Sequence, residues 1–148
     1  MKCRYSYCKH GGEVEKDEAI KEGSSYFHKD CHNEKQLKQQ IEEYYLSNMP
    51  QCTLQILRRV IKQLIHEKDM EAEYLLFVLN YITNNKKPIN NPFGLVNYCN
   101  DGRIKNEYNK IKIKERYSEM NKINEIDISI NKSGYKFKPN NKRITDII

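Results

Sequence analysis

The chain has 148 residues, a formal net charge of +6 and a mean hydropathy of −0.90. This length suits one domain, or a small metal-stabilised module joined to a second small core. No stretch approaches the roughly eighteen apolar residues of a membrane-spanning helix, and no apolar segment typical of a signal peptide stands at the N-terminus. The composition therefore argues against an integral membrane protein and predicts a protein without a membrane partner.

The excess of basic residues favours an anionic partner, either nucleic acid or an acidic protein surface. The alternative is a Lys-rich surface that only keeps the protein soluble. Heavy use of Lys, Asn and Ile is also typical of an AT-rich genome, which raises the Lys content whatever the function. Charge alone therefore leaves both interpretations open.

The first 32 residues contain a group of side chains suited to binding a metal ion. Cys3 and Cys8 enclose four residues, and a His-x-x-Cys pair, His28 and Cys31, follows after nineteen more. Three thiolates and one imidazole form a ligand set that Zn²⁺ prefers over harder oxygen ligands. The spacing predicts one structural Zn²⁺ held by these four residues.

Cysteine usage also bears on the cellular compartment. The chain has five cysteines, an odd number, and the four potential ligands cluster where a reduced zinc site would use them. A secreted protein framed by disulfides would space its cysteines differently. We therefore expect a reducing cytoplasm. Two further histidines, His10 and His32, lie close to the ligands in the sequence and compete for a place in the site.

The segment between the two ligand pairs predicts a short β-hairpin. Residues 19–21 and 25–27 flank a turn that contains Gly23. His28 then ends the second strand, and a helix begins with Asp30 as its N-cap and Cys31 in its first turn. A knuckle, a hairpin and a helix that carries the last ligand form the arrangement of a treble clef.

The Cys-x4-Cys-x19-His-x2-Cys spacing resembles the first zinc site of a LIM domain, with a knuckle two residues longer. The stretch Gly-Ser-Ser-Tyr-Phe-His-Lys-Asp-Cys is similar to the Tyr-aromatic-His-x-x-Cys end of other treble clefs. The second LIM site is missing, because Cys52 and Cys99 stand alone without partners at ligand spacing. The resemblance implies a bound zinc ion and no particular activity.

Beyond the zinc module the hydrophobic pattern predicts a helical body. Apolar residues recur at helical spacing in five segments, at residues 31–46, 53–66, 69–82, 93–100 and 103–120. Asp69 is expected to cap the third segment, which is apolar nearly all round and so lies at the centre. The last helix is expected to face the core through Ile104, Tyr108 and Ile111, and further along through Tyr117 and Met120. The predicted core consists of Leu57, Ile61, Leu64, Leu75, Leu76, Phe77, Leu79 and Ile104.

The expected fold is mainly α-helical with a small zinc-stapled β-hairpin. We expect a treble-clef zinc module at residues 1–35, a helical domain at 36–120 and an extended basic C-terminal tail at 121–148. In the tail, apolar residues alternate on both sides of a turn at residues 131–134. This pattern predicts either a hairpin or an arm that is disordered or ordered only on binding. The oligomeric state is left open.

Two further resemblances concern larger parts of the chain. Residues 44–108, with the segment Asn-Pro-Phe-Gly-Leu-Val-Asn-Tyr before a basic helix, distantly resemble the DnaD-type helical domains of replication-initiation proteins. The whole layout resembles small proteins of phages and mobile elements in low-GC Gram-positive bacteria. These resemblances imply a protein of the cytoplasm of a bacterial host cell.

The sequence predicts a protein that is not an enzyme and has no small-molecule substrate. It contains no Walker-type loop, dinucleotide fingerprint, Gly-x-Ser-x-Gly or His-Glu-x-x-His motif. Basic residues interleaved with aromatic ones near the C-terminus predict a nucleic-acid interface, as in a replication or regulatory accessory protein. The expected contacts are Arg103, Lys105, Lys110, Lys112, Lys114, Arg116, Lys136, Lys138, Lys142 and Arg143.

The alternative is a protein-binding adaptor or inhibitor. Its target would be a replication, transcription or defence complex of the host, as for an anti-CRISPR-like protein. Aromatic and Arg side chains are as typical of protein interfaces as of nucleic-acid ones.

Overall fold

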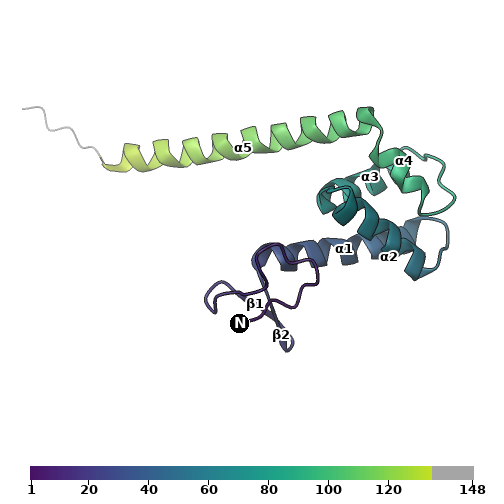
Figure 1. The fold of residues 1–148 in the computed structure, drawn as a ribbon. Helices are drawn as coiled ribbons and strands as arrows, with labels where there is room; N and C mark the ends of the chain where they lie inside the picture. The colour runs from purple at the N-terminus through teal and green to yellow at the C-terminus, as the bar shows by residue number, and fades with distance from the viewer. Residues whose placement is uncertain (135–148) are drawn as a thin grey trace, which may run out of the picture. The chain divides into compact units, whose positions relative to one another are not determined.

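The computed structural model describes the backbone of residues 1–134 and the side chains of residues 1–123. This part of the chain is mainly helical, with one two-stranded antiparallel hairpin near its start (Figure 1), which confirms the predicted fold class at that level. In chain order the elements are β1 (Ile20–Glu22), β2 (Ser25–Phe27), α1 (Lys29–Asn48), α2 (Leu54–Lys62), the π-helical turn η1 (Gln63–Glu67), α3 (Ala72–Asn84), α4 (Gly94–Cys99) and α5 (Gly102–Gly134).

The hairpin forms where the sequence predicts it. Ile20 pairs with Phe27 and Glu22 with Ser25, so two residues remain for the turn. Gly23, the first of them, has a φ of 60°, a left-handed conformation that glycine adopts without the steric cost borne by other residues. Strand β2 ends at the buried Phe27, directly before the first ligand of the His-x-x-Cys pair.

Helix α1 is longer than predicted at both ends. His28 is its N-cap, and Asp30 lies within the first turn, so the prediction that Asp30 is the N-cap was wrong. Strand β2 ends at Phe27 and the helix already begins at Lys29, so His28 is the one residue between them that can act as the cap. The Asp30 carboxylate still lies near the positive end of the helix dipole. The helix ends at Asn48, and the extended Met49 leads into Pro50, because proline disfavours a helical residue before it.

The predicted helix over residues 53–66 begins as an α-helix and ends as a π-helical turn. Helix α2 stops at Lys62 and continues directly as η1, in which the backbone is π-helical. After it, Asp69 has a φ of 53°, and α3 begins at Ala72 with Glu71 as its N-cap. The prediction that Asp69 caps α3 was therefore wrong. This residue turns the chain in a left-handed conformation, which Asp tolerates better than most residues.

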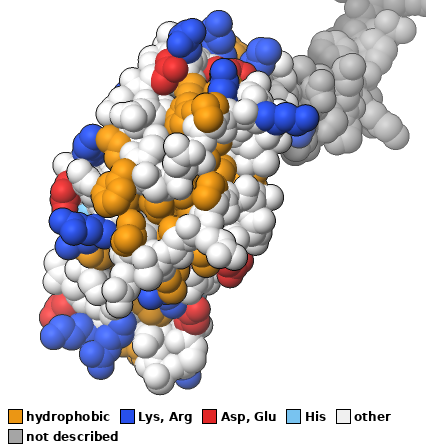
Figure 2. Space-filling view, turned by 90° about the vertical axis from the view of Figure 1, so that its right-hand side faces the viewer, with side chains coloured by type: hydrophobic (Ala, Val, Ile, Leu, Met, Phe, Trp, Pro, Cys, Tyr) orange, Lys and Arg blue, Asp and Glu red, His pale blue; other side chains and the backbone are white. Residues whose placement is uncertain are grey.

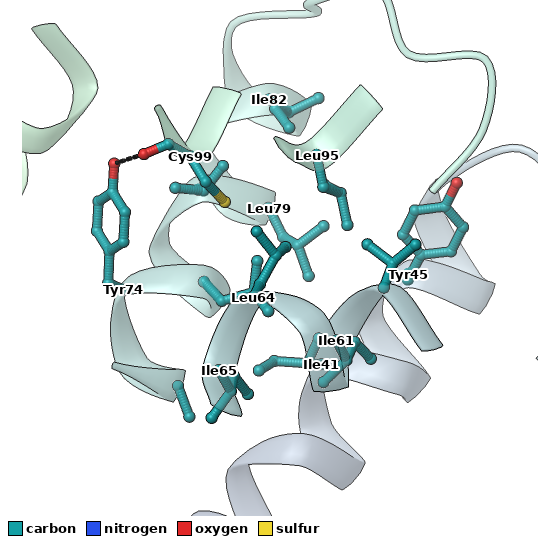
Figure 3. Packing of buried hydrophobic residues seen from close by; sticks show 14 of the residues in the cluster. Ile41, Tyr45, Ile61, Leu64, Ile65, Tyr74, Leu79, Ile82, Leu95 and Cys99 are labelled. Carbon is teal, nitrogen blue, oxygen red and sulfur yellow. Dashed lines mark hydrogen bonds between the residues drawn. The ribbon is translucent and has the colours of Figure 1, made fainter. Parts of the chain in front are cut away.

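One large hydrophobic cluster forms the core of the helical body, where side chains from α1, α2, α3 and α4 meet (Figure 3). The core prediction is confirmed for Leu57, Ile61, Leu64, Leu75, Leu79 and Ile104, which are buried. Leu76 and Phe77 are only half-buried and pack against the cluster from its edge, which corrects the prediction for these two. The buried face of α3 runs through Leu75, Leu79 and Ile82, and at helical spacing the two residues lie beside that face.

Side-chain oxygens hold the starts of the last two helices. The Asn91 Oδ1 accepts a hydrogen bond from the backbone N–H of Gly94 at 3.3 Å, at the first residue of α4. The Asp101 carboxylate accepts one from the backbone N–H of Arg103 at 2.9 Å, at the start of α5. These hydrogen bonds satisfy N–H groups that have no partner inside the helix.

Among the residues of α5 whose side chains the structure describes, 102–123, only those near the start of the helix are buried. Ile104 and Tyr108 belong to the core, whereas Ile111 is 39% exposed and Tyr117 is 64% exposed. The predicted inward stripe therefore ends at Tyr108. Contacts within the chain divide it at this point into two compact units, residues 1–108 and residues 109–148.

Helix α5 also continues to Gly134, beyond the predicted end at Met120. The structure therefore has a helix at residues 121–134, where the sequence pattern predicted a hairpin or a disordered arm. No glycine or proline interrupts the chain from residue 103 to residue 133, and Asn, Ile and Ser are only modestly poor helix formers. The rest of the predicted tail, residues 135–148, lies outside the described residues.

We predict that Leu79→Ala lowers the free energy of unfolding by about 2–5 kcal/mol. The Leu79 side chain is fully buried, so its truncation removes apolar burial and leaves a cavity. Leu46 on α1 is 49% exposed, and the control Leu46→Ala should cost less than about 0.5 kcal/mol. Chemical denaturation followed by circular dichroism measures both. Equal costs would show that α3 does not lie at the centre of the core.

Two buried tyrosines give a matched test of hydrogen bonding in the core. The Tyr74 hydroxyl donates to the Cys99 carbonyl at 3.0 Å (Figure 3). The hydroxyl of the fully buried Tyr45 has no hydrogen-bond partner among the residues that the structure describes. A buried hydroxyl without a partner is costly, whereas a paired one contributes a net ~0.5–1.5 kcal/mol.

We therefore predict that Tyr74→Phe lowers the free energy of unfolding by about 1 kcal/mol, while Tyr45→Phe leaves it unchanged or raises it. The two substitutions remove the same oxygen atom from the same residue type, so each is a control for the other. If Tyr45→Phe proves the more destabilising of the two in one denaturation series, its hydroxyl has a partner and the description of this site is wrong.

Candidate metal centre

Cys3, Cys8, His28 and Cys31 come together, as the sequence predicts. Their ligand atoms, three sulfurs and one imidazole nitrogen, all lie within 4.8 Å of one another. A tetrahedral ion with metal–sulfur distances of about 2.3 Å needs its ligand atoms roughly 3.5–4 Å apart. The cluster is therefore of the right composition and size to hold one metal ion.

Backbone pairing positions the first two ligands. The Cys3 N–H donates to the Gly12 carbonyl at 2.7 Å, and a β-bridge joins Cys3 to Tyr26 of β2, so the first residues run beside the hairpin. The Cys8 N–H donates to the Tyr5 carbonyl at 3.2 Å and closes the turn between the two thiols. We call the segment from Cys3 to Cys8 the knuckle.

The other two ligands come from the junction of β2 and α1. His28 caps the helix, and Cys31 lies in its first turn, where it is buried. The free N–H groups and the positive end of the helix dipole favour a thiolate at this place. The short hairpin therefore matters to the site because it delivers the chain to the start of α1 beside the knuckle.

The His28 ring is held with one nitrogen toward the thiols. Its Nδ1 lies 3.4 Å from the Cys8 Sγ and 3.8 Å from the Cys31 Sγ. Its Nε2 lies 2.8 Å from the backbone carbonyl oxygen of Glu13. Because a carbonyl oxygen only accepts hydrogen bonds, Nε2 carries the proton and the Nδ1 lone pair faces the thiols. Metal-binding histidines commonly donate their second N–H in this way, which fixes the ring.

The thiols need a cation if they are to ionise together. Burial would raise the pKa of Cys3, but hydrogen bonds from the backbone of Tyr5 and His28 bring this pKa down to about 7. Burial, and then hydrogen bonding to the neighbouring thiols of Cys8 and Cys3, raises the pKa of Cys31 to about 12. A bound metal ion favours the thiolates. Metal binding must therefore release protons and weaken as the pH falls.

The two competing histidines lie outside the cluster. The His10 Nε2 is 3.7 Å from the Asp30 carboxylate, and the His32 Nε2 is 3.8 Å from the Glu22 carboxylate. Both rings therefore have acidic neighbours of their own. The geometry favours His28 as the nitrogen ligand.

A group of aromatic and charged side chains joins the knuckle to the helical body. We call it the seam, and it consists of Tyr5, Tyr7, Glu34, Lys38 and His66. The Tyr7 ring stacks on the His66 ring of η1, with centroids 3.7 Å apart and an interplanar angle of 13°. The Tyr5 hydroxyl donates to the Glu34 carboxylate at 2.7 Å. Lys38 of α1 donates to the His66 Nε2 and lies 4.4 Å from the centroid of the Tyr7 ring.

The sequence pattern does not predict the seam. Tyr7 and His66 are far apart in the chain, and the π-helical turn that orients His66 leaves no trace in the hydrophobic period. The only signal is the pair of tyrosines inside the knuckle, which a metal-binding turn alone does not require. Burial, together with the charge of Lys38, lowers the pKa of His66, so this imidazole is neutral at pH 7.

The structure describes six of the ten predicted partner-binding residues, and all six lie on α5. Exposed on α5 are Arg103, Lys105, Lys110, Lys114 and Arg116. Lys112 is half-buried and interacts with other residues, and Arg103 lies 3.5 Å from the Asp101 carboxylate. Outside the described residues lie Lys136, Lys138, Lys142 and Arg143.

Comparison of this chain with protein-family models, with curated proteins and with solved structures finds no match. Within residues 1–134, no helix has both the length and the apolar character needed to cross a membrane. The function must therefore be inferred from the residues of the chain itself.

We predict that the chain binds one metal ion and that Cys31→Ser weakens this binding by more than about 100-fold. The loss of a direct ligand should exceed the 10–100-fold effect of removing an outer partner of a ligand. Cys52→Ser is the control, because Cys52 is not part of the cluster and packs beside the helical core. Native mass spectrometry measures the metal content of both variants. A Cys31→Ser protein that keeps its metal normally would contradict the assignment.

Proposed function

We propose that this protein binds nucleic acid through α5, as a replication or regulatory accessory protein, with the start of α5 anchored in the helical body. The observation that carries this proposal is the segregation of charge. Residues 102–148 contain twelve Lys and Arg against six Asp and Glu, whereas residues 1–101 contain fourteen of each. The whole net charge of +6 therefore belongs to α5 and the residues after it. Such a basic segment attracts the phosphates of nucleic acid.

The described part of α5 combines cations with an aromatic ring on one face. Lys110, Lys114 and Tyr117 follow one another at spacings of four and three residues, so they share a face of the helix. All three are exposed. Ammonium groups neutralise neighbouring phosphates, and a tyrosine ring stacks on an unpaired base. This face is therefore suited to a single strand of DNA or RNA.

The metal ion belongs to the proposal as a structural Zn²⁺ in a treble-clef module. Three thiols and one imidazole match the ligand preference of zinc, and four protein ligands fill a tetrahedral shell. No coordination position then remains for a substrate, which supports a structural role and a protein that is not an enzyme. All five cysteines are free thiols, which supports a reducing compartment such as a bacterial cytoplasm.

We predict that Tyr117→Ala weakens the binding of a single-stranded oligonucleotide by about 1–3 kcal/mol, the usual contribution of one stacked ring. Tyr117→Phe keeps the ring and should bind like the wild type. Fluorescence anisotropy with labelled DNA and RNA measures both. If the two variants show the same reduction in affinity, the ring does not stack on a base.

The salt dependence of the same binding tests the role of the cations. The double variant Lys110→Gln with Lys114→Gln should reduce the steepness of the decrease of log affinity with log salt by about two, one unit for each phosphate contact. The matched control is Lys86→Gln with Lys87→Gln, which removes two exposed charges from the loop before α4. If the wild type shows no affinity for DNA or RNA at about 50 mM salt, the proposed function is wrong, because even non-specific binders hold at that salt concentration.

Exposed apolar side chains favour a second candidate, a protein-binding adaptor or inhibitor. Ile113, Met120 and Ile123 on α5 are 52%, 55% and 60% exposed. Apart from these side chains of α5, Figure 2 shows hydrophobic side chains that gather between Lys and Arg side chains on one face of the helical body. Apolar anchors of this kind are typical of protein interfaces. Binding to a protein through such anchors should depend little on salt, which distinguishes it from binding to nucleic acid.

A further inference from the structure

A pocket of about 390 Å³ lies next to the seam, where the knuckle, α1 and α2 meet. This volume falls within the usual range of sites for small ligands, roughly 300–1,000 Å³. The side chains that matter to its chemistry are Tyr7, Lys38, Glu42, Arg58, Arg59 and Lys62.

The pocket has an excess of positive charge. Among the described residues that line it, only Glu42 has a carboxylate. Arg58 already binds this group and donates from Nε at 3.0 Å and from Nη2 at 3.2 Å. Within the residues whose side chains the structure describes, neither Arg59 nor Lys62 has a carboxylate partner. Two cations therefore face the pocket without a carboxylate partner, whereas Lys38 is paired with Glu34 at 3.8 Å.

The walls of the pocket are held by contacts outside it. Arg59 and Lys62 are three residues apart near the end of α2, so they project from neighbouring positions of one helix face. Tyr7 is fixed by its stack on His66, and Lys38 by its hydrogen bond to the same ring. Tyr7 and Lys38 are therefore in place before any ligand enters, which reduces the entropic cost of binding at their side of the pocket.

We propose that this pocket binds a phosphate group, held by Arg59 and Lys62 beside Tyr7 and Lys38. A guanidinium fork and an ammonium group match the several acceptor oxygens of phosphate and its charge of up to two. A carboxylate offers fewer oxygens and a single charge, so it would leave part of the positive charge unpaired. The phosphate comes either from a small phosphate monoester or from the backbone of a nucleic-acid strand. The pocket is built from other residues than the α5 face, and this proposal does not depend on the function proposed for α5.

Titration of the full chain with inorganic phosphate, at constant ionic strength set with sodium chloride, tests the proposal by isothermal calorimetry and by amide chemical shifts. We expect saturable binding at one site, with shifts at Arg59 and Lys62. Arg59→Gln with Lys62→Gln should weaken binding by about tenfold for each cation removed. Both residues are exposed, so the double variant should fold, which circular dichroism verifies.

The control Lys86→Gln with Lys87→Gln removes the same number of charges elsewhere and should leave the affinity within about twofold. Equal reductions in affinity in the two double variants, or no saturable binding by the wild type, would overturn the proposal. Tyr117→Ala on α5 should leave phosphate binding unchanged. The proposal would also be overturned if Tyr117→Ala abolished phosphate binding while Arg59→Gln with Lys62→Gln retained it.

Two further ligands identify the source of the phosphate. Adenosine 5′-monophosphate represents a monoester, and a pentanucleotide without terminal phosphate represents the backbone. Whichever binds more tightly at the pocket is the source, provided that Arg59→Gln with Lys62→Gln weakens it by about tenfold or more. If this double variant weakens neither ligand, the phosphate site lies elsewhere and the proposal is wrong.

Discussion

The first 35 residues depend on the convergence of three thiols and one imidazole on a single point. Their own hydrophobic cluster is small, with Cys3, Val14, Phe27 and Cys31 as its buried members, and two of these four are the proposed ligands. A cluster of this size buries too little apolar surface to stabilise a fold alone. A metal ion bound by the cluster would supply the missing free energy, because a site absent from the unfolded chain couples binding to folding. We therefore propose that the hairpin and the start of α1 depend on the metal site.

The same constraint places side chains that lie outside the metal cluster. Tyr5 and Tyr7 stand between two ligands, so the closure of the knuckle directs their rings to α1 and η1. Lys38 is half-buried there, and burial lowers its pKa while the charge of Glu34 raises it. The ammonium group is stable in this position because a carboxylate and two aromatic rings surround it. The seam thus connects metal binding in the knuckle to the walls of the basic pocket.

Sequence reasoning succeeded where the determining interactions are local. The four ligands are recognisable by type and spacing, the hairpin by Gly23 in its turn, and the buried faces of the helices by their period. Within each ligand pair, each turn and each apolar stripe, the determining residues lie only a few positions apart in the chain. The N-cap of α1 was predicted at Asp30 but is His28, two residues earlier. Strand β2 ends closer to the start of α1 than the sequence pattern indicates.

What could not be predicted depends on contacts between distant segments. The stack of Tyr7 on His66 requires a π-helical turn, and no period or propensity signals where one extra residue enters a helical turn. Leu76 looks like a core residue by composition, but its burial depends on which helices cover α3. The continuation of α5 past Met120 reflects the absence of helix breakers, which outweighs the alternating pattern of Ile residues.

The most direct test of this account is X-ray absorption at the zinc edge of the purified protein. The account predicts a first shell of three sulfur atoms at about 2.3 Å and one nitrogen atom at about 2.0–2.1 Å. This spectrum reports the identity of the metal and of its ligands together, without a substitution that disturbs the fold. A shell made only of nitrogen and oxygen atoms, or the absence of stoichiometric zinc from protein purified without chelator, would contradict the account.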